Sequence, residues 1–289
     1  MADPAPALAA LDNALAAAVK AVGPSVVHIT RGHHQGGTGI VWDADLVITS
    51  NFHTPDRTRV GVATADGELD QREAEVIGRD RGTDVALLRV SGGALSPASF
   101  REIGELSVGN LALAIGRPGR TARASLRAIG VLGPEVETPH GGTLARYVES
   151  DRQIPRGFAG GPLVAPDGAV IGMNTRTLFR GADIAVPTAT LRAVIPELVA
   201  HGGIRKGYLG VGAVPSKHGA IIASLEDDGP AAKAGVIVGD IITEIDGERV
   251  TGPDTLRSVL ASRPDTTVTL VLSRGGTRTE LDITIGRRS

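Results

Sequence analysis

Three separate stretches of the sequence contain residues that could together perform acyl transfer on a peptide. His53 follows the apolar run 46–49, Asp84 opens the apolar run 85–88, and the loop 157–163 has three glycines within five residues. Acyl transfer needs a nucleophile, a base that takes its proton and a carboxylate that orients the base. A tight glycine-rich loop can also direct several amides at the oxyanion of the transition state.

Each of these signals is weak by itself. A histidine after a strand is more often a surface or capping residue. An aspartate at the start of a strand, or a Gly-Gly-Pro sequence, is more often only part of a turn. The order histidine, aspartate, glycine-rich loop is the order of chymotrypsin-type sites. Their occurrence in this order in one β-rich chain favours the catalytic interpretation.

The centre of the glycine-rich loop lacks a nucleophile, because Ala159 stands where one is expected. Without a hydroxyl at this position, His53 has no proton to remove. Loss of the nucleophile from such a site costs about 10⁶ in rate. We therefore expect the chain as written not to hydrolyse peptides at a useful rate, and we assign the amides of Gly157 and Ala159 as the oxyanion donors.

The elements that must position these residues are two sets of short, β-branched runs separated by turns such as 66–67. Close strands without long helices between them indicate antiparallel barrels or sandwiches. We expect a mainly β fold with two β-barrels of similar size. The first set comprises 26–29, 40–42, 46–49, 60–62, 75–77 and 85–90, and the second comprises 111–115, 128–132, 147–148, 163–164, 170–173 and 184–186.

Helices are expected on both sides of these barrels. Residues 7–22 have apolar residues at helical spacing, and a second helix begins near Thr188, which is placed to cap it. The last 80 or so residues mix short strands and helices and form a second, α+β domain. The predicted division is residues 1–200 for the barrel domain, 201–206 for a linker and 207–289 for the second domain.

Composition excludes several classes of function. The net charge of −2 argues against a nucleic-acid or membrane-surface partner. The chain has no cysteine, so thiolate catalysis and disulfides are excluded. We expect no cofactor and no metal, because the neighbours His33 and His34 would point to opposite faces of a strand. No run approaches the roughly 20 apolar residues of a membrane span, and the first residues do not resemble a signal peptide.

Several segments together resemble the HtrA/Deg family of trypsin-like serine proteases with one C-terminal PDZ domain. The resemblance spans roughly residues 8–288. It implies that His53 is the general base, Asp84 the residue that orients it, and Ala159 the position of the nucleophilic serine. The matching segments are 21–27, 37–41, 50–53, 83–88, 149–151, 157–163 and 171–175.

The resemblance also implies partners and a location. The PDZ carboxylate-binding loop falls on Tyr208, Leu209, Gly210 and Val211, whose amides would hold the C-terminus of a peptide that adds as a strand. Unfolded polypeptides are the implied substrates. The family works mostly in the periplasm, although a cytoplasmic location fits a chain without an export signal. A homotrimer is implied too, but no aromatic residue of the kind that joins such trimers occurs before Trp42.

Two histories explain Ala159. It is either an engineered or recent replacement of serine in a protease of protein quality control, or the mark of a natural pseudoprotease that serves as a peptide-binding scaffold or holdase. The retention of His53, Asp84 and the donor loop favours the first history. The two interpretations predict different codons at position 159 of the natural gene.

Overall fold

The computed structural model describes residues 5–31, 34–52, 54–104, 106–261 and 263–288. The chain divides into two compact units, Met1–Gly203 and Ile204–Ser289. Strands dominate both units. The mainly β fold with a double barrel and a following mixed domain is therefore confirmed.

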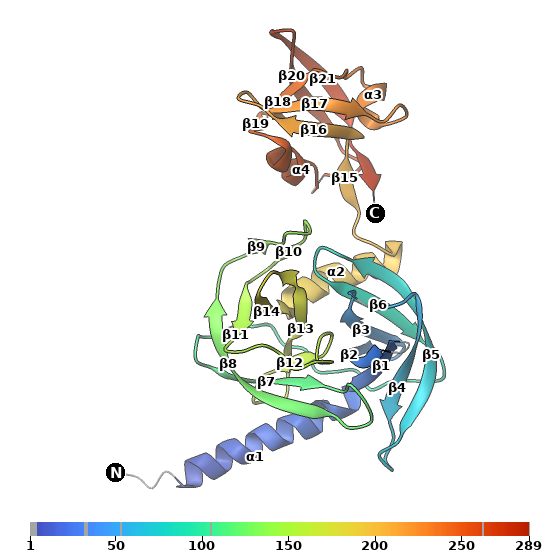
Figure 1. The fold of residues 1–289 in the computed structure, drawn as a ribbon, viewed down its shortest axis with the longest axis vertical. Helices are drawn as coiled ribbons and strands as arrows, with labels where there is room; N and C mark the ends of the chain where they lie inside the picture. The colour runs from blue at the N-terminus through green and yellow to red at the C-terminus, as the bar shows by residue number, and fades with distance from the viewer. Residues whose placement is uncertain (1–4, 32–33, 53, 105, 262, 289) are drawn as a thin grey trace. The chain divides into compact units, whose positions relative to one another are not determined.

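The first barrel of the first unit forms from the first predicted set of β-branched runs (Figure 1). Its six strands close in the order β1-β2-β3-β6-β5-β4, and every neighbouring pair is antiparallel. Valine, isoleucine and leucine side chains fill its interior, among them Val27, Ile29, Val47 and Leu88. The strands are β1 (Val26–Arg31), β2 (His34–Asp43), β3 (Leu46–Ser50), β4 (Arg57–Ala63), β5 (Leu69–Asp80) and β6 (Val85–Val90).

The second barrel forms from the second predicted set and closes in the order β11-β14-β13-β12-β7-β8. A small hairpin, β9 (Val136–Glu137) and β10 (Thr143–Leu144), is inserted between two of its strands. The barrel strands are β7 (Leu111–Gly116), β8 (Arg123–Leu132), β11 (Val148–Ser150), β12 (Pro162–Val164), β13 (Val170–Phe179) and β14 (Ala182–Pro187).

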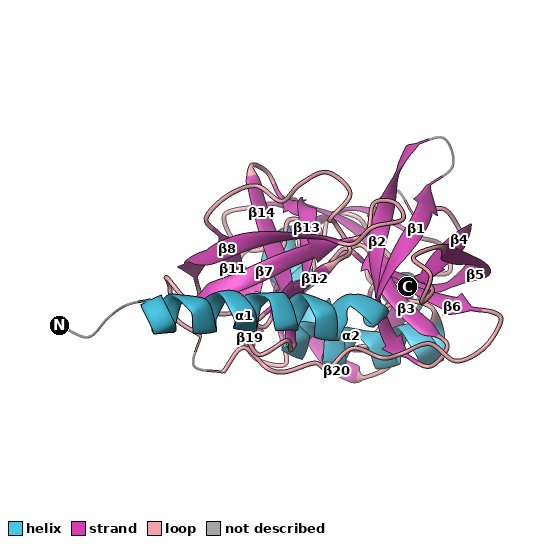
Figure 2. Cartoon of the chain, turned by 90° about the horizontal axis from the view of Figure 1, so that it is seen from below, coloured by secondary structure: helices cyan, strands magenta, loops and turns pink. Residues whose placement is uncertain are grey.

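The first unit begins with one helix and ends with another, and Figure 2 draws both below the barrel strands. The helix α1 (Ala5–Val22) is followed by the 3₁₀ turn η1 (Gly23–Ser25), and only Ala18 and Val22 of α1 are buried. The helix α2 (Thr188–His201) ends at Gly202 in the left-handed conformation. None of the described helices combines the length and the apolar character that crossing a membrane requires.

The prediction that Thr188 caps α2 is wrong. The N-cap residue is Pro187, and no side chain accepts a bond there. Thr188 is fully buried instead, and its hydroxyl donates to the Val170 carbonyl at 3.2 Å. The tertiary contact with β13 takes the hydroxyl that the sequence pattern assigned to the helix end.

The single tryptophan lies in the first unit. Trp42, on β2, packs against Phe100 with 4.5 Å between ring centroids. The Phe100 backbone in turn bridges to Val170 on β13. This aromatic pair therefore lies where the connection between the barrels passes from the first to the second.

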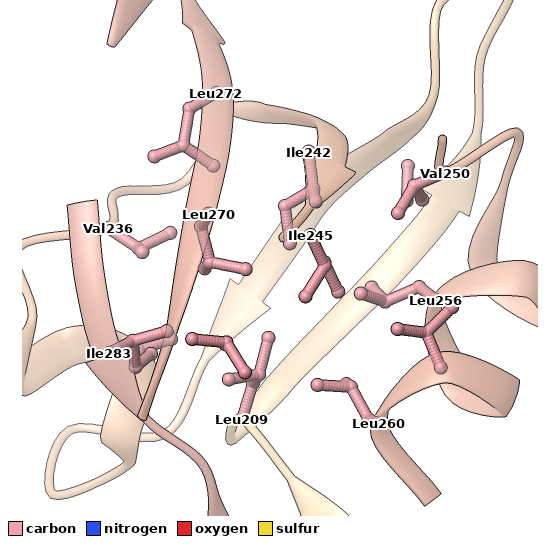
Figure 3. Packing of buried hydrophobic residues seen from close by; sticks show 14 of the residues in the cluster. Leu209, Val236, Ile242, Ile245, Val250, Leu256, Leu260, Leu270, Leu272 and Ile283 are labelled. Carbon is pink, nitrogen blue, oxygen red and sulfur yellow. The ribbon is translucent and has the colours of Figure 1, made fainter. Parts of the chain in front are cut away.

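The second unit packs a five-stranded path, β16-β17-β18-β20-β21, around an aliphatic core (Figure 3). The strand β19 pairs with β18, and β15 pairs with β22. Leu256, Val259 and Leu260 face this core from α4. The elements are β15 (Lys206–Tyr208), β16 (Val211–Pro215), β17 (Ala220–Leu225), α3 (Pro230–Lys233), β18 (Ile241–Ile245), β19 (Glu248–Arg249), α4 (Pro253–Ala261), β20 (Thr267–Arg274), β21 (Thr277–Thr284) and β22 (Gly286–Arg288).

Candidate active site and peptide groove

Asp84 is buried between the two barrels and its carboxylate accepts three hydrogen bonds. The residue is only 3% exposed. Ser50 Oγ donates to Oδ2 at 2.7 Å, Thr175 Oγ1 donates to the same oxygen at 2.6 Å, and the Phe52 amide donates to Oδ1 at 2.9 Å. These donors come from β3, from β13 and from the segment after β3. Together they fix one orientation of the carboxylate.

The backbone of Asp84 is strained, with φ of 58°. Left-handed conformations cost free energy for residues other than glycine and persist where the surroundings impose them. The preceding turn is held by Asp80, which accepts bonds from the Gly82 amide and the Thr83 hydroxyl. The β9–β10 hairpin also contacts this turn, because Thr138 Oγ1 donates to the Gly82 carbonyl at 2.6 Å.

The glycine-rich loop is fixed at both of its ends. At one end Thr38 Oγ1 donates to the Gly157 carbonyl at 2.6 Å and accepts the Arg117 amide at 2.8 Å. At the other end the Gly160 amide donates to the Asn174 carbonyl at 2.8 Å. Gly157 and Gly160 both have positive φ, 82° and 85°, which explains why glycine is needed at these two positions.

The loop lies against β3, the strand that ends at Ser50. A Cβ added at Gly160 would lie 2.7 Å from the Ser50 amide nitrogen, and still closer to Thr38 O and Thr49 Oγ1. Ser50 is also a donor to Asp84. The structure therefore brings the loop containing Ala159 and the carboxylate of Asp84 together through one shared neighbour.

The amides predicted to bind an oxyanion make no hydrogen bond to a described residue: neither the Gly157 nor the Ala159 amide donates one. The intervening Phe158 amide closes a turn onto the Pro155 carbonyl at 3.1 Å. The Phe158 side chain is 3% exposed and packs with Ala114 and Ile154. An oxyanion could thus accept bonds from both outer amides of an anchored loop.

His53 lies outside the described residues, so its predicted role as base stays a prediction. The segment on either side of it is held by Arg79. The guanidinium donates to Asn51 Oδ1 and to the Thr54 carbonyl, both at 2.8 Å, and to Asp56 Oδ1 at 2.9 Å. The preceding residue, Phe52, is the amide donor to Asp84.

Within the described ranges, no group of three or more histidine, aspartate or glutamate side chains is placed to bind a metal ion. His33 lies outside those ranges.

The predicted carboxylate-binding loop connects β15 with β16 in the second unit. Tyr208 ends β15 and Val211 begins β16, while Leu209 is buried and Gly210 has φ of 73°. The loop carbonyls are occupied: Leu209 O accepts the Ala231 amide and Gly210 O accepts the Glu226 amide, each at 2.9 Å. The strand β16 ends the sheet order, so it has an edge to which a peptide could add.

Sequence reasoning assigned no role to Ser50, Thr175 or Thr38. All three are buried hydroxyl residues, and each bonds to a group of the predicted site. A usable signal was present, because a buried hydroxyl within an apolar strand must find a partner. The identity of that partner was not readable, since Thr175 and Asp84 are 91 positions apart.

Comparison with known protein families agrees with this geometry. The family described as a trypsin-like peptidase domain matches residues 37–173, and the PDZ domain family matches residues 207–285. The fold and the site thus define a trypsin-like peptidase domain followed by one PDZ domain.

Individual relatives narrow the class. A "probable periplasmic serine endoprotease DegP-like" from Brucella suis is 30% identical over 277 residues, covering 87% of this chain and 52% of the relative. A serine endoprotease from Yersinia pestis has a similar structure, with 27% identity and a TM-score of 0.73, covering 94% of this chain and 97% of that chain. The structure described as the HtrA-type protease AlgW with tripeptide is also similar, with 25% sequence identity and a TM-score of 0.69. The match covers 95% of this chain and 97% of that chain.

The chain belongs to the HtrA/Deg family, with a single PDZ domain. It spans about half the length of the curated relatives that it matches.

Proposed function

We propose that the protein is a serine endopeptidase of protein quality control, which cleaves unfolded or misfolded polypeptides when a serine occupies position 159. The observation that carries this proposal is the buried carboxylate of Asp84, which accepts three hydrogen bonds and lies beside the loop that contains Ala159. A carboxylate held in one orientation is what a catalytic histidine needs to keep its tautomer and direction. In the form given, Ala159 leaves the site without a nucleophile.

The proposed mechanism assigns one step to each group. A serine hydroxyl at 159 attacks the peptide carbonyl while His53 removes its proton, and His53 then returns a proton to the leaving amine. Asp84 orients His53 and stabilises its charged form. The Gly157 and Ala159 amides receive the oxyanion, a contribution that is worth about 10²–10³ in rate for a single donor.

The test is Ala159→Ser in the full chain, assayed with an unfolded protein and with a serine-directed phosphonate. We expect cleavage and covalent labelling, neither of which the parent chain should show beyond a residual rate about 10⁶ lower. The control is Ala159→Ser combined with Asp84→Asn, which should lose most of the gained activity. If Ala159→Ser neither cleaves nor reacts, the site is defective beyond its nucleophile and the proposal fails.

The second candidate function is a peptide-binding scaffold or holdase built on an inactive protease. The exposed edge of β16 beside the Gly210 loop favours it, since this region needs no nucleophile. In this case the parent chain should suppress aggregation of an unfolded protein as well as Ala159→Ser does. A serine codon at position 159 of the natural gene would exclude this candidate, and an alanine codon would exclude the engineered history.

The peptide partner of the PDZ domain is proposed to be a free C-terminus held by the amides of Tyr208, Leu209, Gly210 and Val211. Fluorescent peptides with a free or an amidated C-terminus test this directly. We expect binding of the free form only, because the amide removes the anionic acceptor. Equal binding of both forms would contradict a carboxylate-binding loop.

Location and assembly are proposals as well. The names of the relatives favour the periplasm over the cytoplasm, and mass spectrometry of the native N-terminus tests whether an export segment is removed. Leu8 and Leu11 of α1 are 64% and 38% exposed, which supports a homotrimer that covers them. Sedimentation of the parent and of Leu8→Asp tests this, since a trimer joined through α1 should dissociate in the variant.

A further inference from the structure

A guanidinium is buried inside the second barrel and makes no ion pair with a described carboxylate, although Asp151 and Asp183 lie near enough to favour its charge. Arg127 lies on β8 and is 1% exposed. Its Nη1 donates to the Arg152 carbonyl at 3.3 Å and its Nη2 to the Gln153 carbonyl at 3.0 Å, while Nε has no partner among the described residues. Burial lowers the pKa of this guanidinium from its ordinary value. An apolar side chain would pack here at lower cost, so stability alone does not account for an arginine.

A second side chain, that of Asp183, also holds the backbone that Arg127 bonds to. Asp183, on β14, accepts the Ile154 amide on Oδ2 at 2.8 Å, and its side chain is 9% exposed. Arg176 lies 3.4 Å from the same oxygen. Two carbonyls and one amide of the consecutive residues 152–154 are therefore bonded to two buried side chains of opposite charge.

Residues 152–154, which Arg127 and Asp183 hold, lead directly into the glycine-rich loop 157–163, called the oxyanion loop below. Ile154 is buried against Phe158 and Ala114. The next residue, Pro155, provides the carbonyl that closes the turn onto the Phe158 amide. Between them the chain must reach the left-handed conformation of Gly157, whose own amide and that of Ala159 are the candidate oxyanion donors. Only Pro155 and Arg156 separate residues 152–154 from Gly157, so a shift of the held backbone would displace those amides.

We propose that Arg127 and Asp183 are positioning residues for the oxyanion loop, and that they hold residues 152–154 so that the Gly157 and Ala159 amides keep their direction. This assignment rests on the proposed function, since an oxyanion forms only in a chain with a nucleophile. The two residues act through the backbone and touch no substrate. Their effect belongs in the transition state, where misplacement of a donor by about 1 Å can cost 10²-fold in rate.

The first experiment uses the full chain with Ala159→Ser and adds Arg127→Met. This substitution keeps the apolar part of the side chain and removes the guanidinium that donates to the two carbonyls. We expect kcat and the rate of phosphonate labelling to fall about 10- to 100-fold with KM within threefold. Arg127→Lys should recover part of this loss, because one ammonium can bond to one of the two carbonyls. The matched control is Arg123→Met, an exposed arginine on the same strand, which should change neither rate.

The second experiment needs no catalytic activity. Hydrogen exchange of residues 154–160 is compared in the parent chain, Arg127→Met and Arg123→Met. We expect exchange about tenfold faster in Arg127→Met alone, because local opening of the loop becomes easier. Should Arg127→Met unfold early, Arg127→Lys takes its place in both experiments.

The outcomes separate the two proposals. If Ala159→Ser is inactive while exchange responds to Arg127→Met, the proposed function fails and the positioning role remains. If Ala159→Ser is active but Arg127→Met behaves as Arg123→Met in kcat and labelling, the positioning role is overturned and the function stands. Unchanged exchange in both Arg127 variants overturns the positioning role whatever the activity.

Discussion

The backbone of Gly142 lies directly against that of Gly82, two residues before Asp84. A Cβ placed on Gly82 would be 2.7 Å from Gly142 Cα and 2.8 Å from its amide nitrogen. The hairpin that contains Gly142 also supplies the Thr138 hydroxyl to the Gly82 carbonyl. A hairpin of the second barrel thus supports the turn that presents Asp84 on the first.

Gly142→Ala should push this hairpin away from Gly82. Gly142 is not in the left-handed region, so the penalty is one of space. We expect the first unit to lose about 1–3 kcal/mol in its free energy of unfolding, measured by denaturant unfolding. Gly119→Ala is the control, because nothing lies within 4 Å of a Cβ at Gly119. Equal losses in the two variants would contradict a tight contact at Gly82.

Gly160→Ala separates backbone strain from crowding. Gly160 and Gly181 both have φ of 85°, but a Cβ at Gly181 meets nothing within 4 Å. Gly181→Ala should therefore cost only the strain, about 1–2 kcal/mol. Gly160→Ala should cost at least about 1–3 kcal/mol more, because its Cβ meets Ser50. Denaturant unfolding measures both, and equal values would mean that the loop moves freely away from β3.

An ion pair between the buried carboxylate of Asp240 and the partly exposed guanidinium of Arg274 stabilises the second unit. Asp240 is 1% exposed and accepts Arg274 Nε on Oδ1 at 2.9 Å and Arg274 Nη2 on Oδ2 at 2.8 Å. The Ile237 amide also donates to it at 2.9 Å. Asp240→Asn should lower the free energy of unfolding of this unit by about 1–3 kcal/mol at pH 7, because the buried side chain loses its charge-assisted hydrogen bonds.

The same pair predicts a pH dependence. The bond from Arg274 lowers the pKa of Asp240 in the folded protein, whereas the unfolded value is about 3.9. Its contribution is fully present above that value and is lost as the pH falls through the folded pKa. The difference in free energy of unfolding between the parent and Asp240→Asn should therefore shrink below about pH 4.

The control for both measurements is Asp254→Asn. The Asp254 side chain is 96% exposed, so this substitution should lower the free energy of unfolding by less than about 1 kcal/mol.

The hydroxyl of Tyr147 should ionise at an unusually high pH. Burial and the hydrogen bond of its hydroxyl to Glu149 Oε2 raise the pKa of Tyr147 to about 12. Tyr208→Phe leaves Tyr147 as the only tyrosine. Ultraviolet titration of this variant should therefore show one transition with a midpoint near pH 12. Glu149→Gln should move the midpoint down, and a midpoint close to the usual value of about 10 in the Tyr208→Phe protein would contradict the contact.

Much of the fold follows from local sequence. The β-branched runs appear as the strands of the two barrels, and Gly275-Gly276, a local glycine pair, forms the turn between β20 and β21. These features depend on neighbours a few positions apart, which a sequence displays directly. Thr188 shows the limit, because its hydroxyl found a partner on β13 instead of at its own helix end.

The site was predictable at its motif residues and not at their supports. Asp84 and the 157–163 loop could be named because a mechanism requires those residue types in that order. Arg127 looked like an ordinary strand arginine, since nothing in the local pattern separates an inward-facing charge from an exposed one. The Gly82–Gly142 contact joins residues 60 positions apart and depends on how the barrels pack.

The position of the single tryptophan, Trp42, in the first unit makes the two units spectroscopically distinct. Because the chain has one tryptophan and it lies in the first unit, indole fluorescence follows the unfolding of that unit alone. Far-ultraviolet circular dichroism senses both units. A mismatch between the two transitions would show that the peptidase and PDZ domains unfold independently, and each variant above could then be attributed to its own domain without cutting the chain.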